Sequence, residues 1–206
     1  MTAPGSARLQ PIPRDEWGDE ARAALRAAYS EETAARLSST GPDAIPMPNA
    51  LATLMHHPAL AGPFLTYNNV LLQTPALDHR LRELMVLRVG WRTRSRYEWL
   101  QHVRLAQRVG ITPDEIAAIA DDPRLHAWTP IEADMLAATD QLIDRYWIDD
   151  DTWARLAKQL DEKQLIELVF VVGTYTALAM AFNSFGLQSD PELQQLAIAS
   201  PPEIEE

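Results

Sequence analysis

The chain has 206 residues, of which 47% are hydrophobic and 23% charged, a balance typical of soluble globular proteins. Its net charge of −11 argues against nucleic acid and anionic membranes as its main partners. Because the chain contains no cysteine, disulfides, thiolate catalysis and cysteine-based metal sites are excluded. The polar, proline-rich N-terminus lacks the apolar stretch of a signal peptide, which predicts a cytoplasmic protein.

Helical periodicity dominates the chain, and alternating apolar runs are few, so we predict an all-α fold without a sheet. Two helix starts are especially clear, since Thr112 and Thr129 each precede a proline and stand three residues before a glutamate. The predicted helices cover about residues 15–37, 49–56, 58–72, 77–91, 93–109, a short helix from 112, 129–146, 149–160 and 161–187. We expect a flexible segment over residues 1–14, one domain over residues 15–190 and an acidic tail over residues 191–206.

One predicted helix raises the question of a membrane, because residues 168–187 form a stretch of 20 residues without a formal charge. The stretch contains threonine, tyrosine, asparagine and serine, and no basic residue follows it. We therefore interpret it as the buried central helix of a soluble protein.

Two stretches of the chain are similar to each other. Leu77-Asp78, followed by Arg82 to Val86, resembles Leu160-Asp161, followed by Ile166 to Phe170, and the alignment pairs Glu83 with Glu167. We interpret the fold as two related helical units, of which the first kept polar groups and the second became hydrophobic.

Residues 77–108 carry eight arginines against three acidic residues, a local charge of +5. Such a patch would attract an anionic small molecule. The alternative is that most of these arginines pair with acidic helices or with a neighbouring subunit. Among them, we expect Arg96 and Arg88 to bind a substrate carboxylate.

Glu98 and His102 lie four residues apart and therefore share one face of a helix. A carboxylate beside an imidazole orients the ring and stabilises its protonated form, which gives a usable acid/base pair. The alternative, which the spacing alone favours, is a surface pair worth a few tenths of a kcal/mol. Glu83 interrupts an apolar helical stretch, so it is either exposed or buried for a reason.

The same residues carry a resemblance to the carboxymuconolactone decarboxylase family, within the AhpD-like all-α superfamily. It extends from about Met47 to Leu187 and rests on Arg82-Glu83-Leu84, Tyr97-Glu98-Trp99-Leu100-Gln101-His102 and Thr112-Pro113-Asp114-Glu115. In the peroxidase branch of this family, a Cys-x-x-Cys pair acts with a histidine and an upstream glutamate. The resemblance places these four groups at Ser95, Glu98, His102 and Glu83, so both thiols are missing and thiol peroxidase activity is not expected.

The resemblance implies a cofactor-independent lyase that acts on a small cyclic or unsaturated carboxylic acid or lactone by decarboxylation or a related isomerisation. In this hypothesis His102 moves a proton at carbon, Glu98 orients His102, and Glu83 completes a proton relay. The expected substrate-binding residues are Arg96, Arg88, Trp99, Tyr97 and Asn49, and no metal or organic cofactor is expected.

The expected partners are an anionic small molecule and further copies of the chain, as a dimer or trimer. Asn68 either adds polarity to the pocket or lies on the surface. Two alternatives to the enzyme remain open: a non-catalytic oligomeric binding or scaffold protein, and a protein that binds metal through Glu83, Glu98 and His102. The residues do not choose among the possible reactions.

Overall fold

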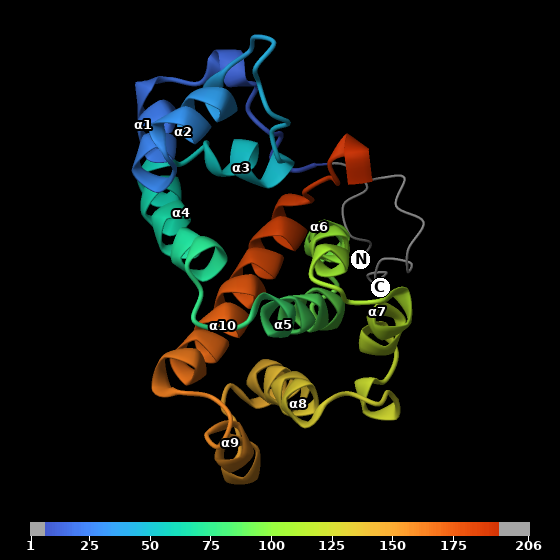
Figure 1. Ribbon diagram of the computed structural model, residues 1–206. Helices are drawn as coiled ribbons and strands as arrows, with labels where there is room; N and C mark the ends of the chain where they lie inside the picture. Colours follow the sequence, from blue (N-terminus) through green and yellow to red (C-terminus); the bar gives the residue numbers. More distant parts are fainter. Residues whose placement is uncertain (1–6, 194–206) are drawn as a thin grey trace.

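The computed structural model describes residues 7–193, and in that range it contains ten α-helices, three short 3₁₀ helices and no strand (Figure 1). The all-α prediction is therefore confirmed. The α-helices are α1 (Asp19–Ala28), α2 (Glu31–Ser38), α3 (Asn49–Leu54), α4 (Pro58–Gln73), α5 (His79–Arg92), α6 (Arg96–Arg108), α7 (Pro113–Ala120), α8 (Pro130–Arg145), α9 (Asp150–Leu156) and α10 (Glu162–Phe185). The 3₁₀ helices are η1 (Arg14–Glu16), η2 (Pro123–Leu125) and η3 (Pro191–Leu193).

Local capping chemistry sets several helix starts. The Thr112 side chain accepts a hydrogen bond from the Glu115 backbone, whose own carboxylate accepts one from the Thr112 N–H, and Thr129 and Glu132 start α8 in the same way. Each pair satisfies backbone N–H groups that have no partner within the helix. Both predicted capping boxes are confirmed.

The N-terminal region differs from the prediction of one helix over residues 15–37. The chain is extended at Tyr29, with φ −122° and ψ 163°, and α2 begins only after Ser30. The Ser30 side chain accepts a hydrogen bond from the Thr33 N–H. A serine that caps a new helix in this way competes with continuation of the previous one, so the helical pattern is divided in two.

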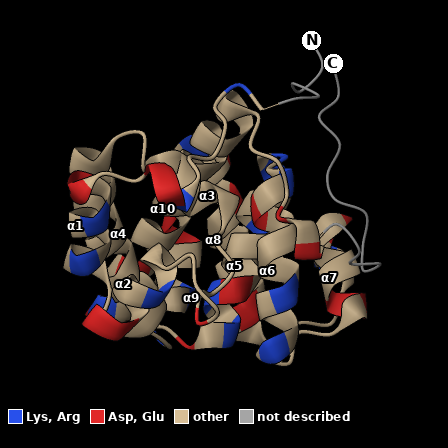
Figure 2. Ribbon diagram, turned by 90° about the horizontal axis from the view of Figure 1, so that it is seen from above, with Lys and Arg blue, Asp and Glu red and all other residues tan. Residues whose placement is uncertain are grey.

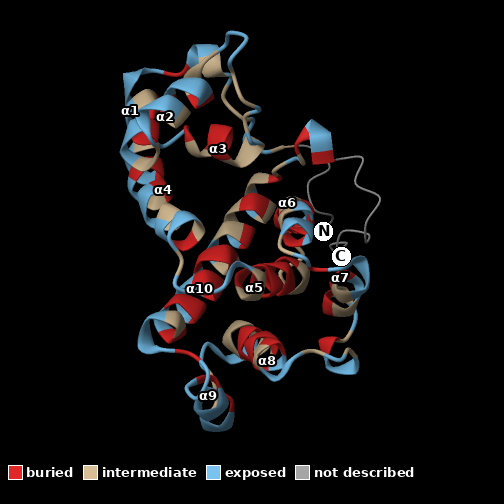
Figure 3. Cartoon of the chain, in the orientation of Figure 1, coloured by how far each residue is buried: buried red, intermediate tan, exposed pale blue. Residues whose placement is uncertain are grey.

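The helices form two groups that α10 connects. α5 lies in the larger group and packs against α6, α7, α8 and α10, so residues 82–90 are buried without interruption (Figure 3). The smaller group consists of α1 to α4, with its own core around Trp17, Leu25 and Met55. α10 contacts α4 as well as α5, α6 and α8. This arrangement places α3 and α4 opposite α6 and α10.

α10 is long and apolar enough to cross a membrane by length and composition, and half of its most apolar stretch is buried in the fold. Central helices of soluble proteins have the same property. Its other side exposes Ile166, Val169, Phe170 and Met180, and Phe170 lies beside Tyr67 of α4. The helix is thus central, as predicted, but it also presents an apolar face on the outside.

The predicted second helical unit is built differently from the first. The first unit is two helices, α5 and α6, joined by a turn, whereas the corresponding part of α10 continues without a break. Glu83 and Glu167 are both buried, but Glu167 accepts hydrogen bonds from the N–H groups of Ala76 and Leu77 instead of facing a helix of its own unit.

Residues 1–6 and 194–206 lie outside the described range, and with them most of the predicted acidic tail and part of the predicted N-terminal segment. The described part of the N-terminal segment is hydrogen-bonded to the fold. The N–H of Arg8 donates to Phe185 O, and that of Ile12 donates to Ala52 O.

Candidate functional site

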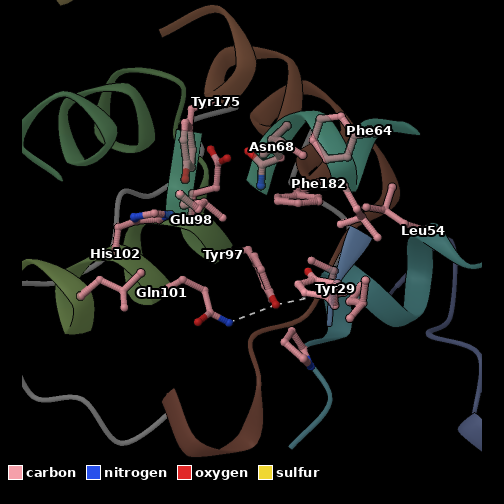
Figure 4. Close-up of a pocket in the computed structure, with 17 residues that line it drawn as sticks. Tyr29, Leu54, Phe64, Asn68, Tyr97, Glu98, Gln101, His102, Tyr175 and Phe182 are labelled. Atoms are coloured by element: carbon pink, nitrogen blue, oxygen red, sulfur yellow. Dashed lines mark hydrogen bonds between the residues drawn. The ribbon is translucent and has the colours of Figure 1, made fainter. Parts of the chain in front are cut away.

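A cavity of about 250 Å³ lies between α3 and α4 on one side and α6 and α10 on the other (Figure 4). Most of its wall is apolar, with Leu51, Phe64, Leu65 and Phe182 among the lining residues. The polar side chains that line it are Tyr29, Asn68, Tyr97, Glu98, Gln101, His102 and Tyr175. An apolar cavity with a few convergent polar groups is the usual form of a small-molecule site.

His102 is held in place by Glu83 of the neighbouring helix. His102 Nδ1 donates to Glu83 Oε2 at 2.7 Å, while Glu83 Oε1 accepts from the Arg82 guanidinium at 2.8 Å. Arg82 also donates to the backbone oxygens of Leu71 and Leu72. Since Nδ1 is engaged and His102 lines the cavity, Nε2 is the ring nitrogen available to a ligand.

Glu83 is fully buried, yet the groups around it favour its charged form. Burial alone would raise the pKa of Glu83, but the charges and hydrogen bonds of His102 and Arg82 outweigh it and hold this pKa below 4.5. Arg82, Glu83 and His102 therefore form a buried chain of charge-assisted hydrogen bonds that ends at the cavity.

Glu98 is the second carboxyl group of the site, and its surroundings are the opposite. It is 2% exposed, and within the described chain its carboxyl oxygens make no hydrogen bond of good geometry. Burial raises the pKa of Glu98 well above 4.5, and the nearby Ser95 hydroxyl lowers it by less. An unpaired buried carboxylate is costly, so these surroundings favour the neutral, protonated form of Glu98.

The prediction that Glu98 pairs with His102 is therefore wrong, because His102 pairs with Glu83. Glu98 and His102 do line the same cavity. Residues four apart share a helix face, but α5 packs against α6 and brings Glu83 to His102. The carboxylate of Glu83 accepts the hydrogen bond of the imidazole Nδ1. Glu83, not Glu98, orients His102.

The two arginines expected to bind a carboxylate lie elsewhere, which corrects the prediction for both. Arg88 donates to Asp140 of α8 at 2.7 Å and to Ile119 O at 2.7 Å, and Arg96 is exposed at the start of α6. Neither lines the cavity. Arg88 packs beneath α7 and α8, where the carboxylate of Asp140 neutralises it.

Three of the eight arginines of the basic segment, Arg80, Arg88 and Arg92, follow the alternative and pair with acidic residues of α7 and α8. Arg80 pairs with Glu115 and Glu132, and Arg92 pairs with Asp140 and Asp144. Acidic and basic residues accordingly lie side by side around α5 and α6 (Figure 2). A count of charges along residues 77–108 suggests a positive patch, but the acidic partners of these arginines lie in α7 and α8.

Of the other three expected substrate-binding residues, only Tyr97 lines the cavity. Trp99 is fully buried in the core against Trp91, because its side of α6 faces α5. Asn49 starts α3, and its side chain donates to Gln188 O, so it faces the C-terminal segment. The prediction that Trp99 and Asn49 bind the substrate is therefore wrong: Trp99 packs in the core, and Asn49 binds the C-terminal segment.

Several residues of the site have no clear sequence signal. Asp190, 93 positions from Tyr97, accepts a hydrogen bond from the Tyr97 hydroxyl at 3.1 Å and a further one from Gln101. It also accepts one from the Asn49 N–H at 2.8 Å. Asn68, for which the sequence left two alternatives, lines the cavity, and its Oδ1 is buried without a partner among the described residues.

The metal-binding alternative finds no support in residues 7–193, which contain no group of three or more histidine, aspartate or glutamate side chains placed to hold a metal ion. Glu83 is already engaged on both oxygens, by Arg82 and by His102. The three residues therefore do not present a common ligand set.

Comparison with solved structures identifies the class of fold. A peroxidase-related protein from Silicibacter sp. TM1040 has a TM-score of 0.71 at 16% identity, and the match covers 95% of this chain and 98% of that chain. A peroxidase-related protein with an alkylhydroperoxidase AhpD core from Ralstonia eutropha JMP134 has a TM-score of 0.70 at 16% identity, covering 90% and 94%. The fold is AhpD-like.

The sequence comparison gives the family. Residues 58–141 match the carboxymuconolactone decarboxylase family, so this segment, which contains Glu83, Glu98 and His102, belongs to that family, as the resemblance predicts. The fold is also similar to that of the debrominase Bmp8, solved as a cysteine-to-alanine variant with 2,3,4-tribromopyrrole, with a TM-score of 0.69 at 15% identity over 92% of this chain and 95% of that chain. No curated protein matches the chain significantly.

Proposed function

We propose that the chain is a small-molecule enzyme that catalyses proton transfer at carbon in the cavity between α3, α4, α6 and α10. The observation that carries this proposal is the pair of opposite groups on one wall: an imidazole held by a buried carboxylate, and a neutral carboxylic acid without a partner. A base and an acid whose environments drive their protonation apart are what general acid/base catalysis requires. The family match supports an enzyme, and a retained peroxidase mechanism would need the thiols that the sequence lacks.

The proposed step is the enolisation of a small cyclic carbonyl compound with a C=C bond between its β and γ carbons. His102 Nε2 takes a proton from the α carbon, the electron pair of that C–H bond forms a double bond to the carbonyl carbon, and the carbonyl π electrons take the proton of Glu98 at oxygen, which gives a dienol. The imidazole then returns its proton to the γ carbon while Glu98 takes its proton back from the oxygen, which completes an isomerisation to the α,β-unsaturated carbonyl compound. The step conserves protons and electrons without a redox partner. Loss of CO2 at the same site would use the same proton donors.

Glu83 and Arg82 act through His102. The carboxylate of Glu83 fixes the ring with Nδ1 protonated, which leaves Nε2 as the base, and it stabilises the imidazolium that forms during the step. Arg82 keeps Glu83 charged. Both are therefore positioning residues.

The experiment that tests the proposal is solvent deuterium exchange, which needs no knowledge of the final product. The purified protein is incubated in D2O with a panel of cyclic enones, lactones and unsaturated acids, and the loss of C–H signals is followed by proton NMR. His102→Ala should reduce the exchange of any compound that the parent turns over by about 10²–10⁴-fold.

The matched control is His79→Ala, which removes an exposed histidine at the start of α5, outside the cavity, and should exchange at the parent's rate. Exchange at the parent's rate in the His102 variant would refute the assignment. Absence of exchange across the whole panel, with binding of the same compounds intact, would support the non-catalytic binding protein instead.

A further inference from the structure

The polar groups on the cavity wall define the charge that a ligand can carry. Of the described residues that line the cavity, none is lysine or arginine, and the ionisable ones are Glu98, His102, Tyr29, Tyr97 and Tyr175. His102 already faces the charge of Glu83 through Nδ1. A carboxylate ligand would enter a mostly apolar space with no guanidinium to receive it, and burying an unpaired charge is strongly unfavourable.

Two side chains that line the cavity have buried polar atoms without a partner among the described residues, and they differ in the hydrogen bonds that they can form. Both oxygens of Glu98, and Oδ1 of Asn68, are inaccessible to solvent and make no hydrogen bond within the described chain. In Figure 4, Glu98 and Asn68 project into the same cavity, from α6 and α4. A neutral carboxyl group can donate one hydrogen bond, whereas an amide oxygen only accepts.

We propose that the cavity binds an uncharged, largely apolar small molecule whose single polar end carries a hydrogen-bond acceptor for Glu98 and a donor for Asn68. This inference rests on the proposed function, since it names the substrate class of the same site. It favours lactams, amides and hydroxy-ketones over carboxylates. It also favours isomerisation over decarboxylation, because an ionised carboxyl group is the form that loses CO2.

The volume of the cavity limits the size of the ligand. About 250 Å³ is just below the range of about 300–1,000 Å³ that is usual for drug-sized ligands. The apolar wall residues, among them Leu51, Phe64 and Phe182, would surround a single ring. The ligand class is therefore a one-ring compound with one polar substituent.

Three ring compounds of similar shape test the inference: benzamide, which is neutral with a donor and an acceptor; acetophenone, which is neutral with an acceptor only; and benzoate, which is an anion. Binding to the purified full-length protein is measured by calorimetry at a pH where benzoate is ionised. We expect benzamide to bind most tightly and benzoate at least about tenfold more weakly than benzamide, because its charge remains unpaired. Equal or tighter binding of benzoate, or no binding of benzamide at millimolar concentration, would overturn the proposal.

Two variants assign the two polar contacts. Asn68→Leu should weaken benzamide about tenfold and leave acetophenone unchanged, because only benzamide has a donor for Oδ1. This comparison is made within one variant, so a general effect on folding cannot imitate it. A protonated-carboxyl stretch in the infrared spectrum at neutral pH should disappear in Glu98→Gln, and an ionised Glu98 in the parent would refute the proposal.

The binding result and the exchange result can be separated. His102→Ala should keep the preference for benzamide over benzoate while it loses proton exchange. If the preference is present and no compound exchanges, the proposed function fails alone. If exchange is present but benzoate binds as well as benzamide, the inference about charge fails alone.

Discussion

The α5 side and the α6 side of the site each bury one carboxyl group, and the two groups are treated in opposite ways. Glu83 on α5 lies between Arg82 and His102 and is held charged. Glu98 on α6 has no such neighbours and is held neutral. Burial is similar in both, so the difference comes from the partners. The comparison shows how one small cavity can contain a fixed base and an available acid.

The largest effect is expected from removing the charge on the α5 side. Glu83→Gln should lower the free energy of unfolding by about 3–5 kcal/mol, because it leaves the buried Arg82 guanidinium without its counter-charge. Guanidinium chloride unfolding of parent and variant at neutral pH measures it. The double variant Arg82→Met with Glu83→Gln should recover much of the lost free energy of unfolding, because no buried charge is then left unpaired. A loss below about 1 kcal/mol in the single variant would show that Arg82 does not depend on Glu83 for its counter-charge.

Removing the acid on the α6 side should separate stability from activity. Glu98→Gln replaces a neutral carboxyl group by a neutral amide of nearly the same size, so the free energy of unfolding at neutral pH should fall by no more than about 1 kcal/mol, and it should rise where the parent has to keep a buried acid protonated. Proton exchange should fall by about 10²-fold or more, since the amide cannot give up a proton to the carbonyl oxygen. Unfolding curves and exchange rates are measured on the same preparation. A loss of stability as large as that of Glu83→Gln would place Glu98 in an ion pair.

The dependence of stability on pH should have opposite signs for the two groups. The pKa of Glu98 is raised, so its stabilising contribution is complete below about 4.5 and is lost as the pH rises toward the pKa in the folded state. The pKa of Glu83 is lowered, so its contribution is complete above about 4.5 and is lost as the pH falls through the pKa in the folded state. Each slope is at most about 1.4 kcal/mol per pH unit.

The measurement compares the parent with Glu98→Gln between about pH 5 and pH 8. The stability of the variant relative to the parent should increase with pH, because only the parent has to ionise a buried acid. A difference that stays constant over this range would mean that Glu98 titrates at its ordinary pKa in the folded protein.

The sequence predicts the local parts of this molecule well and the long-range parts poorly. Thr112 and Thr129 start helices as expected, because capping depends on residues three positions apart. The shared helix face of Glu98 and His102 is also local, and both side chains do reach one cavity. The partner of His102, however, is Glu83, 19 positions away on another helix.

The arginines and Asp190 illustrate the same limit. Arg88 and Arg92 find their acid, Asp140, on α8, about 50 positions along the chain, so a local count of charges describes a patch that the fold neutralises. Asp190 joins Tyr97 and Gln101 over about 90 positions. Neither contact follows from helical periodicity, because periodicity gives the buried face of a helix but not the element that covers it.

The smallest effect on the site is expected from substitutions on the exposed side of α10. They test whether this exposed apolar side and the buried side that packs on α5 have separate roles. Phe170 and Ile166 are 53% and 60% exposed, and Val70 of α4 is 55% exposed. Contiguous exposed apolar side chains of this kind usually mark an interface, and we propose that this face joins copies of the chain into a homo-oligomer.

Phe170→Lys should then sediment as a monomer, with proton exchange and benzamide binding close to those of the parent, because Phe170 does not line the cavity. Leu125→Lys is the matched control: Leu125 is 81% exposed, lies in η2 away from this face and should leave the assembly unchanged. Sedimentation velocity at micromolar concentration measures all three proteins, and a parent that is already a monomer would disprove the interface while leaving the contrast between Glu83 and Glu98 untouched.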